Sequence, residues 1–192
     1  MRVLKAITLF AILSATFISC STDNNEDIAS KEEVMLKNNS NYAIQNFESA
    51  LRKVSSDVKN IVDRDDFNKN PEAYEKELQI VLNPLVSPSK DLIKMMNITE
   101  AEVPGIHTSF TEHQTIATGL LIYSQQTADS DPSVLDCVAR AFVGLELHEG
   151  FWSSFTNRRV LIKAVGKVAS RYLGAIGAAL IVYDFVDCME WI

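Results

Sequence analysis

The first 70 residues contain neither glycine nor proline, and no glycine occurs before Gly105. These two residue types are the ones that most readily end helices and make turns. Within this stretch, apolar residues recur at alternating spacings of three and four: Ile44, Phe47, Leu51, Val54, Val58 and Ile61. The pattern predicts a helix from about Asn39 to Asp63 with one apolar side. We expect that side to pack within its own domain, and a coiled-coil partner is the alternative.

Further helices are predicted from their start signals. The prolines at 71, 88 and 132 each follow a capping residue, and proline is favoured at the first helical position because it lacks an N–H group. Thr99 and Ser109 each stand three residues before a glutamate, the spacing of a capping box. We expect helices near 71–83, 88–97, 110–127, 131–147, 157–172 and 174–189. The pattern predicts an all-α fold, a compact bundle of about six helices with a C-terminal apolar helical hairpin.

The N-terminus has the layout of a secretory signal peptide over residues 1–19. Two basic residues precede an uncharged run over 6–18 that is too short to span a membrane. The stretch Phe17-Ile18-Ser19-Cys20 resembles the bacterial lipobox, with phenylalanine where leucine is usual. This resemblance implies cleavage before Cys20 and lipidation of that cysteine. An ordinary signal peptide followed by an incidental cysteine is the alternative.

The residues after Cys20 are polar and acidic from 21 to 27. Such a stretch buries too little apolar surface to fold, so we expect a lipidated, flexible acidic tether over 20–38. This arrangement is similar to exported lipoproteins of Bacteroidota-type bacteria, and the segments 82–90 and 182–189 are similar to stretches of their small, uncharacterised helical lipoproteins. The resemblance implies a lipid anchor in the outer membrane, at the cell surface or at its periplasmic face. It implies no catalytic activity.

Composition and charge limit the remaining classes of function. The 192 residues, of which 47% are hydrophobic, suffice for one packed domain, which we place over 39–192. Removal of residues 1–19 leaves 16 basic and 25 acidic residues, a formal net charge of −9. An acidic chain is a poor match to nucleic acid, which requires a basic surface. We therefore expect membrane attachment through the lipid, no nucleic-acid partner, and a protein or glycan partner of unknown identity.

Two cysteines remain in this interpretation, Cys137 and Cys188, in a protein that leaves the reducing cytoplasm. We predict a disulfide between them. It would close a loop of about 50 residues and stabilise the fold by roughly 4 kcal/mol. Two buried free thiols are the alternative. A metal site is not expected, because neither cysteine has a second Cys or His at ligand spacing.

A periodic basic set distinguishes the C-terminal third. Arg159, Lys163, Lys167 and Arg171 are each four residues apart, and no acidic residue lies between Gly150 and Tyr183. We call these four residues the cationic row. The uncharged residues 172–183 that follow span only about 18 Å as a helix, against the roughly 30 Å of a bilayer core. We expect a buried hairpin with a solvated basic face. The alternative is a membrane-active or immunity-type protein that uses the segment 157–189, with the cationic row contacting lipid or a partner.

Small residues also recur at spacings of four in this region, at Gly166, Ser170, Gly174 and Ala178. Because small side chains let helix backbones approach closely, this set predicts a groove that another helix fills. Catalytic signals are weak by comparison. The sequence has no nucleophile elbow, phosphate loop or zinc-protease motif, and His107, His113 and His148 lack convincing metal spacing. We assign no catalytic, cofactor or metal residue. A hydrolase with an unrecognised site is a second alternative to a binding or structural module.

Overall fold

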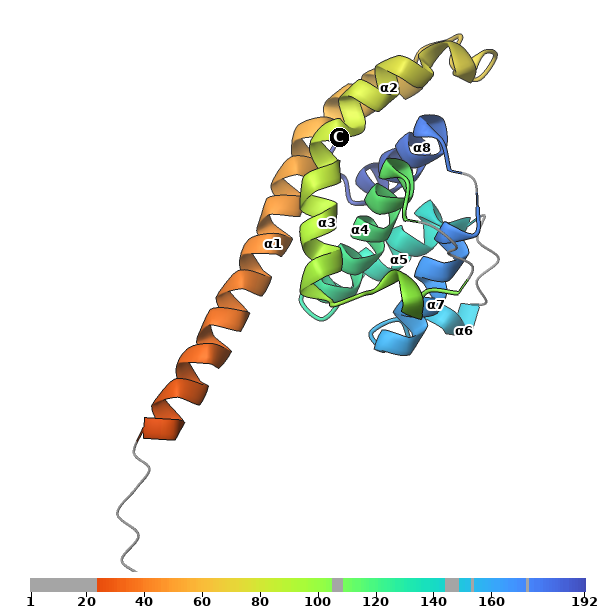
Figure 1. Ribbon diagram of the computed structural model, residues 1–192. Helices are drawn as coiled ribbons and strands as arrows, with labels where there is room; N and C mark the ends of the chain where they lie inside the picture. Colours follow the sequence, from red (N-terminus) through yellow and green to blue (C-terminus); the bar gives the residue numbers. More distant parts are fainter. Residues whose placement is uncertain (1–23, 105–108, 144–148, 153, 172) are drawn as a thin grey trace, which may run out of the picture. The chain divides into compact units, whose positions relative to one another are not determined.

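The longest helix is α1, which runs from Asn24 to Val62 (Figure 1). The computed structural model describes residues 24–104, 109–143, 149–152, 154–171 and 173–192, and its described side chains begin at residue 39. The predicted start of this helix near Asn39 is wrong, because residues 24–38, assigned to a flexible tether, are helical. No glycine or proline interrupts them, and residues 32–37 are mostly strong helix formers.

The remaining chain is helical, with no strand among the described residues, as the sequence predicts. Residues from Leu36 onward form one compact unit. Its other elements are η1 (Pro71–Tyr74), α2 (Glu75–Leu82), η2 (Asn83–Leu85), α3 (Val86–Met95), η3 (Glu100–Glu102), α4 (Glu112–Thr127), α5 (Ser133–Ala141), α6 (Glu149–Trp152), α7 (Arg158–Ala169) and α8 (Ala175–Cys188). The predicted apolar side of α1 is buried in this unit, so it packs within its own domain.

Helix starts follow the predicted signals in part. Thr99 forms the predicted capping box with η3, and Asp131 accepts a hydrogen bond from the backbone N–H of Ser133 at 3.1 Å. The cap predicted at Ser109 is wrong, because Thr111 caps α4 instead. Local spacing therefore locates these helix starts to within a few residues.

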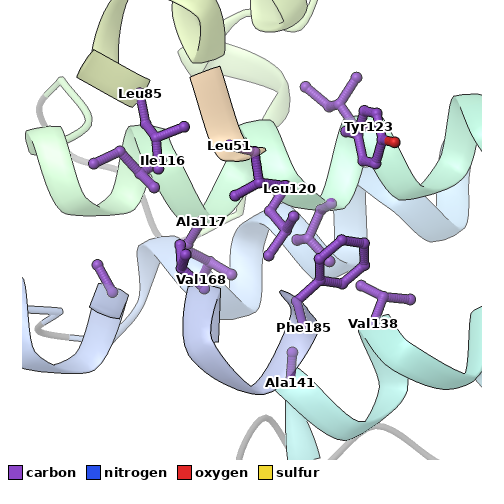
Figure 2. Packing of buried hydrophobic residues seen from close by; sticks show 14 of the residues in the cluster. Leu51, Leu85, Ile116, Ala117, Leu120, Tyr123, Val138, Ala141, Val168 and Phe185 are labelled. Atoms are coloured by element: carbon purple, nitrogen blue, oxygen red, sulfur yellow. The ribbon is translucent and has the colours of Figure 1, made fainter. Parts of the chain in front are cut away.

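Helix α4 is the centre of the bundle. It contacts α3, α5, α7 and α8, and every residue from 115 to 125 is buried. A helix that is buried on all sides belongs to the interior, and this one carries apolar residues around most of its circumference. Figure 2 shows side chains of other elements meeting α4 there: Leu51 of α1, Leu85 of η2, Val138 of α5, Val168 of α7 and Phe185 of α8.

Helices α3 and α4 approach each other closely at a glycine of α4. A Cβ atom on Gly119 would lie 2.5 Å from Ser89 Oγ and 2.9 Å from Ser89 Cα, so α3 and α4 could not pack this closely with any larger residue. The predicted small-residue groove is filled differently. A Cβ on Gly166 would lie 3.0 Å from the carbonyl oxygen of Pro104, and a Cβ on Gly174 would lie 3.0 Å from Glu75 Oε1. At these two glycines a loop and a carboxylate take the place of the expected helix.

The last two helices do not pack chiefly on each other. Helix α7 packs on α4, whereas α8 packs on α5, α4 and α2 (Figure 1). The expected hairpin over 157–189 is therefore replaced by two helices that share α4 as a neighbour. The apolar side chains of α8 lie in the core: Ala175, Ala178, Ala179, Val182, Phe185 and Val186. Within the described part of the chain, none of the helices has both the length and the apolar character needed to cross a bilayer.

Two helix ends are capped by side chains from distant parts of the chain. Glu75, the first residue of α2, accepts hydrogen bonds from the backbone N–H groups of Ala175 at 2.8 Å and Ile176 at 3.3 Å, at the start of α8. Gln114 Nε2 of α4 donates to the carbonyl oxygens of Ala169 at 3.0 Å and Arg171 at 3.1 Å, at the end of α7. Backbone N–H groups at the start of a helix and carbonyl oxygens at its end have no hydrogen-bond partner within that helix. The two caps supply such partners, and they thereby attach α8 to α2 and α7 to α4.

Candidate functional site

An open hollow lies where the end of α1 meets α8. Its volume is about 530 Å³. It is lined by Val62, Asp63, Arg64, Asp65 and Asn68 from the end of α1 and the turn after it, and by Leu180, Tyr183 and Asp184 of α8. We call it the polar hollow. Its two walls are more than 100 residues apart in sequence and meet only because α8 packs in the bundle.

A hydrogen-bonded network holds the two walls together. Tyr183 Oη donates to Asp63 Oδ1 at 2.8 Å, and Lys59 Nζ lies 3.0 Å from Asp63 Oδ2. The bonds from Lys59 and then from Tyr183 lower the pKa of Asp63, and the same carboxylate raises the pKa of the Tyr183 hydroxyl. Asp63 is therefore ionised at neutral pH, and its hydrogen bond with Tyr183 links α8 to the end of α1.

Asp184 differs from Asp63 because its surroundings disfavour its charge. Burial raises its pKa; Arg140 opposes this shift and Asp187 adds to it. The guanidinium of Arg140 donates to Asp187 Oδ2 at 2.9 Å rather than to Asp184. A cationic or hydroxyl group of a ligand in the polar hollow would restore part of the solvation that this carboxylate has lost. The described residues contain no group of three or more His, Cys, Asp or Glu arranged to hold a metal ion.

A second hollow lies between the end of α3 and the start of α4, with a volume of about 520 Å³. Apolar side chains of Ile93, Ile98 and Phe110 line part of it, and Ile98 is buried. The exposed residues Lys90 and Lys94 also line it. We call it the amphipathic groove, because apolar and cationic groups stand side by side along it.

The cationic row lies on the solvent side of α7. Arg159, Lys163 and Lys167 belong to α7 and Arg171 follows its end, and all four are exposed. The helix begins where Asn157 Oδ1 accepts a hydrogen bond from the backbone N–H of Arg159 at 2.9 Å. The other side of α7 is buried against the bundle: Leu161, Ala164, Val165, Gly166 and Val168. The periodicity thus separates a buried apolar side from an exposed basic one, as predicted.

The predicted disulfide is present. Cys137 of α5 and Cys188 of α8 are bonded, with Cα atoms 5.3 Å apart. The ion pair between Arg140 and Asp187 joins the same two helices at 2.9 Å. Cys20, the predicted lipidation site, lies outside the described residues, as do His107 and His148.

Sequence reasoning missed the residues that build the polar hollow. Asp63 and Tyr183 occur in unremarkable local sequence, so no pattern pointed to their contact. Asp184 carried a weak signal, because it directly follows twelve uncharged residues, 172–183. An acidic side chain at the end of such a run is forced close to apolar neighbours, and the pKa of Asp184 reflects that position.

Similarity to known proteins assigns no function to these surfaces. Comparison with protein-family models, with curated proteins and with solved structures found no match to this chain. The chemistry and geometry of the residues themselves are therefore the basis for a functional proposal.

Proposed function

We propose that this chain is an exported protein, anchored in the outer membrane through lipid on Cys20, whose folded part is a binding or structural module. The observation that carries the proposal is the disulfide between Cys137 and Cys188. Disulfides persist in oxidising compartments such as the periplasm and the cell surface, and they are rare in the cytosol. The pairing also accounts for two of the three cysteines in the chain and leaves Cys20 for another role.

The sequence around Cys20 supports the anchor. A basic start, an uncharged run and a small residue before the cysteine are the features that a lipoprotein signal requires. One acyl chain gives only marginal membrane binding, whereas two or more give stable attachment. An anchor of this kind leaves the folded part free of any need to insert into the bilayer.

The two hollows support a role in binding. Both are open to solvent, and the polar hollow is held in shape by the contacts of Asp63 with Lys59 and Tyr183. Preformed concave surfaces with a few polar groups are the usual places where proteins bind ligands. We assign the polar hollow to a ligand with cationic or hydroxyl groups, and the proposal names no catalytic residue.

The anchor is tested by comparing Cys20→Ser with Ser21→Ala in cells grown with a labelled fatty acid. We expect the label and detergent-phase partitioning to be lost in Cys20→Ser and kept in Ser21→Ala, because only the first change removes the acylated sulfur. Protease added to intact cells would then show whether the anchored protein faces outward.

Retention of label and detergent partitioning by Cys20→Ser would contradict the anchor. Recovery of Cys137 and Cys188 as free thiols from protein matured in its own envelope would contradict export to an oxidising compartment.

A further inference from the structure

The members of the cationic row have no carboxylate partner within the described residues. The other arginines of the described part are each paired with an acid, at nitrogen–oxygen distances of 2.8 to 3.1 Å. These pairs are Arg52 with Glu48, Arg64 with Glu77, Arg140 with Asp187 and Arg158 with Glu102. Among the described arginines, only Arg159 and Arg171 therefore lack an acidic partner. Most described lysines outside the row are also unpaired, but they are scattered over several elements, whereas the four cations of the row follow one another along α7 and the turn after it.

The surroundings of the row strengthen this contrast. The sequence has no acidic residue between Gly150 and Tyr183, although acids outnumber bases in the chain as a whole. The exposure of these four side chains, taken alone, is consistent with a surface that contacts only water. Segregation of four unpaired cations on one helix of an acidic protein, however, creates a local positive potential that attracts an anionic partner.

The shape of the row indicates an extended partner. Arg159, Lys163 and Lys167 follow one another every four residues along the outside of α7, over about 12 Å, and Arg171 continues the row just past the helix end. Neither the polar hollow nor the amphipathic groove includes any of them. An exposed, elongated row of charge contacts a surface of repeating anionic groups more completely than it contacts a compact ligand, which requires a concave site.

We propose that the cationic row docks the folded part onto anionic lipid headgroups of the membrane that holds the anchor. This inference rests on the proposed lipid on Cys20. Fifteen residues lie between Cys20 and Leu36, where the compact unit begins, so even a fully extended chain would span at most about 55 Å, and the helical residues 24–35 make the distance shorter. Docking is thus an intramolecular event, and even a weak contact is populated.

The strength of the contact follows from the number of charges. Each Lys or Arg near an anionic bilayer surface contributes a similar amount to the free energy of membrane binding. Four together change vesicle partitioning by about a thousandfold. Salt weakens the contact, because the attraction falls off within about 8 Å at physiological ionic strength. The buried side of α7 stays in the bundle throughout, so docking requires no unfolding or insertion of the helix.

The experiment uses the unlipidated mature chain, residues 20–192 with Cys20→Ser, sedimented with phosphatidylcholine vesicles with and without phosphatidylglycerol. We expect binding to the anionic vesicles at low salt and none to the neutral ones. Changing the whole row to Gln should reduce binding about a thousandfold. A control changes three exposed lysines outside both hollows to Gln and should bind like the parent chain: Lys53, Lys69 and Lys76.

Equal binding by the row variant and the parent would overturn the proposal, as would no binding of the parent to anionic vesicles. Row-dependent binding of poly-glutamate without vesicle binding would also overturn it, and would assign the row to an acidic protein instead. The charge-conserving variant Arg159→Lys with Arg171→Lys should bind as the parent does, which separates loss of charge from loss of fold. Because this chain carries no lipid, its result is independent of the anchor test on Cys20.

Discussion

Removal of the carboxylate of Glu75 is expected to destabilise the fold, because this side chain caps a helix that begins 100 residues later in the sequence. Helix α8 begins after Gly174, which has no side chain with which to cap it. Glu75 supplies the missing acceptor through its bonds to Ala175 and Ile176. Glu75→Ala leaves both N–H groups without that acceptor and removes a negative charge from the positive end of the helix dipole.

The expected magnitude follows from the geometry. A hydrogen bond to a charged group contributes about 1.5–3 kcal/mol. The bond to Ala175 at 2.8 Å has ideal length, whereas the bond to Ile176 at 3.3 Å exceeds the usual range and contributes less. Because Glu75 is only half-buried, water replaces part of what is lost. We therefore expect Glu75→Ala to lower the free energy of unfolding by about 2 kcal/mol, and Glu75→Gln by about 1 kcal/mol, since the amide oxygen still accepts.

A second substitution tests the same contact from the helix side. Gly174 has the extended backbone of an N-cap residue, at which serine is preferred. In the wild type, a Cβ on Gly174 would lie 3.0 Å from Glu75 Oε1, so Gly174→Ser should bring no gain. In the Glu75→Ala background this space is free, and the serine should restore at least a few tenths of a kcal/mol. The two substitutions are thus expected to be non-additive.

The measurement is urea unfolding followed by circular dichroism on the disulfide-bonded chain. The control is Glu72→Ala, an exposed glutamate in η1 whose removal should change stability by no more than about 0.5 kcal/mol. A loss for Glu75→Ala no larger than that of Glu72→Ala would refute the reasoning. So would equal effects of Gly174→Ser with and without Glu75.

Replacement of Cys137 and Cys188 by alanine should lower the free energy of unfolding by roughly 4 kcal/mol, since the disulfide closes a loop between residues 51 positions apart. Urea titrations measure this loss, and a loss below about 1 kcal/mol would contradict the chain-entropy argument. Asp184→Asn should stabilise the protein at neutral pH, because the pKa of Asp184 is raised in the fold and its ionisation therefore opposes folding. The sign requires this gain to shrink as the pH falls through the raised pKa of the folded state and to vanish below the ordinary aspartate pKa of 3.8, where both states carry the proton. Thermal unfolding at several pH values checks this, and a gain that is the same at every pH would contradict it.

The sequence by itself determined the class of fold, because helix formation is read from local properties. The spacing of apolar residues in α1, the scarcity of helix breakers and the caps at Thr99 and Asp131 all act within one or two turns. The exposure of the cationic row followed from the same periodicity. The early start of α1 contradicts the predicted tether: polar composition predicts disorder there, whereas residues 24–38 carry no helix breaker and include strong helix formers.

Only the tertiary structure decided which surfaces meet. The cap of Glu75 on α8, the contact of Tyr183 with Asp63 and the approach of Ser89 to Gly119 join residues that share no local pattern. Each depends on the shapes and directions of whole helices after packing, and a period of 3.6 residues says which side of a helix is apolar but not which neighbour covers it. For the same reason the packing placed α7 on α4, and α8 on α5, α4 and α2, where sequence order alone predicted a hairpin.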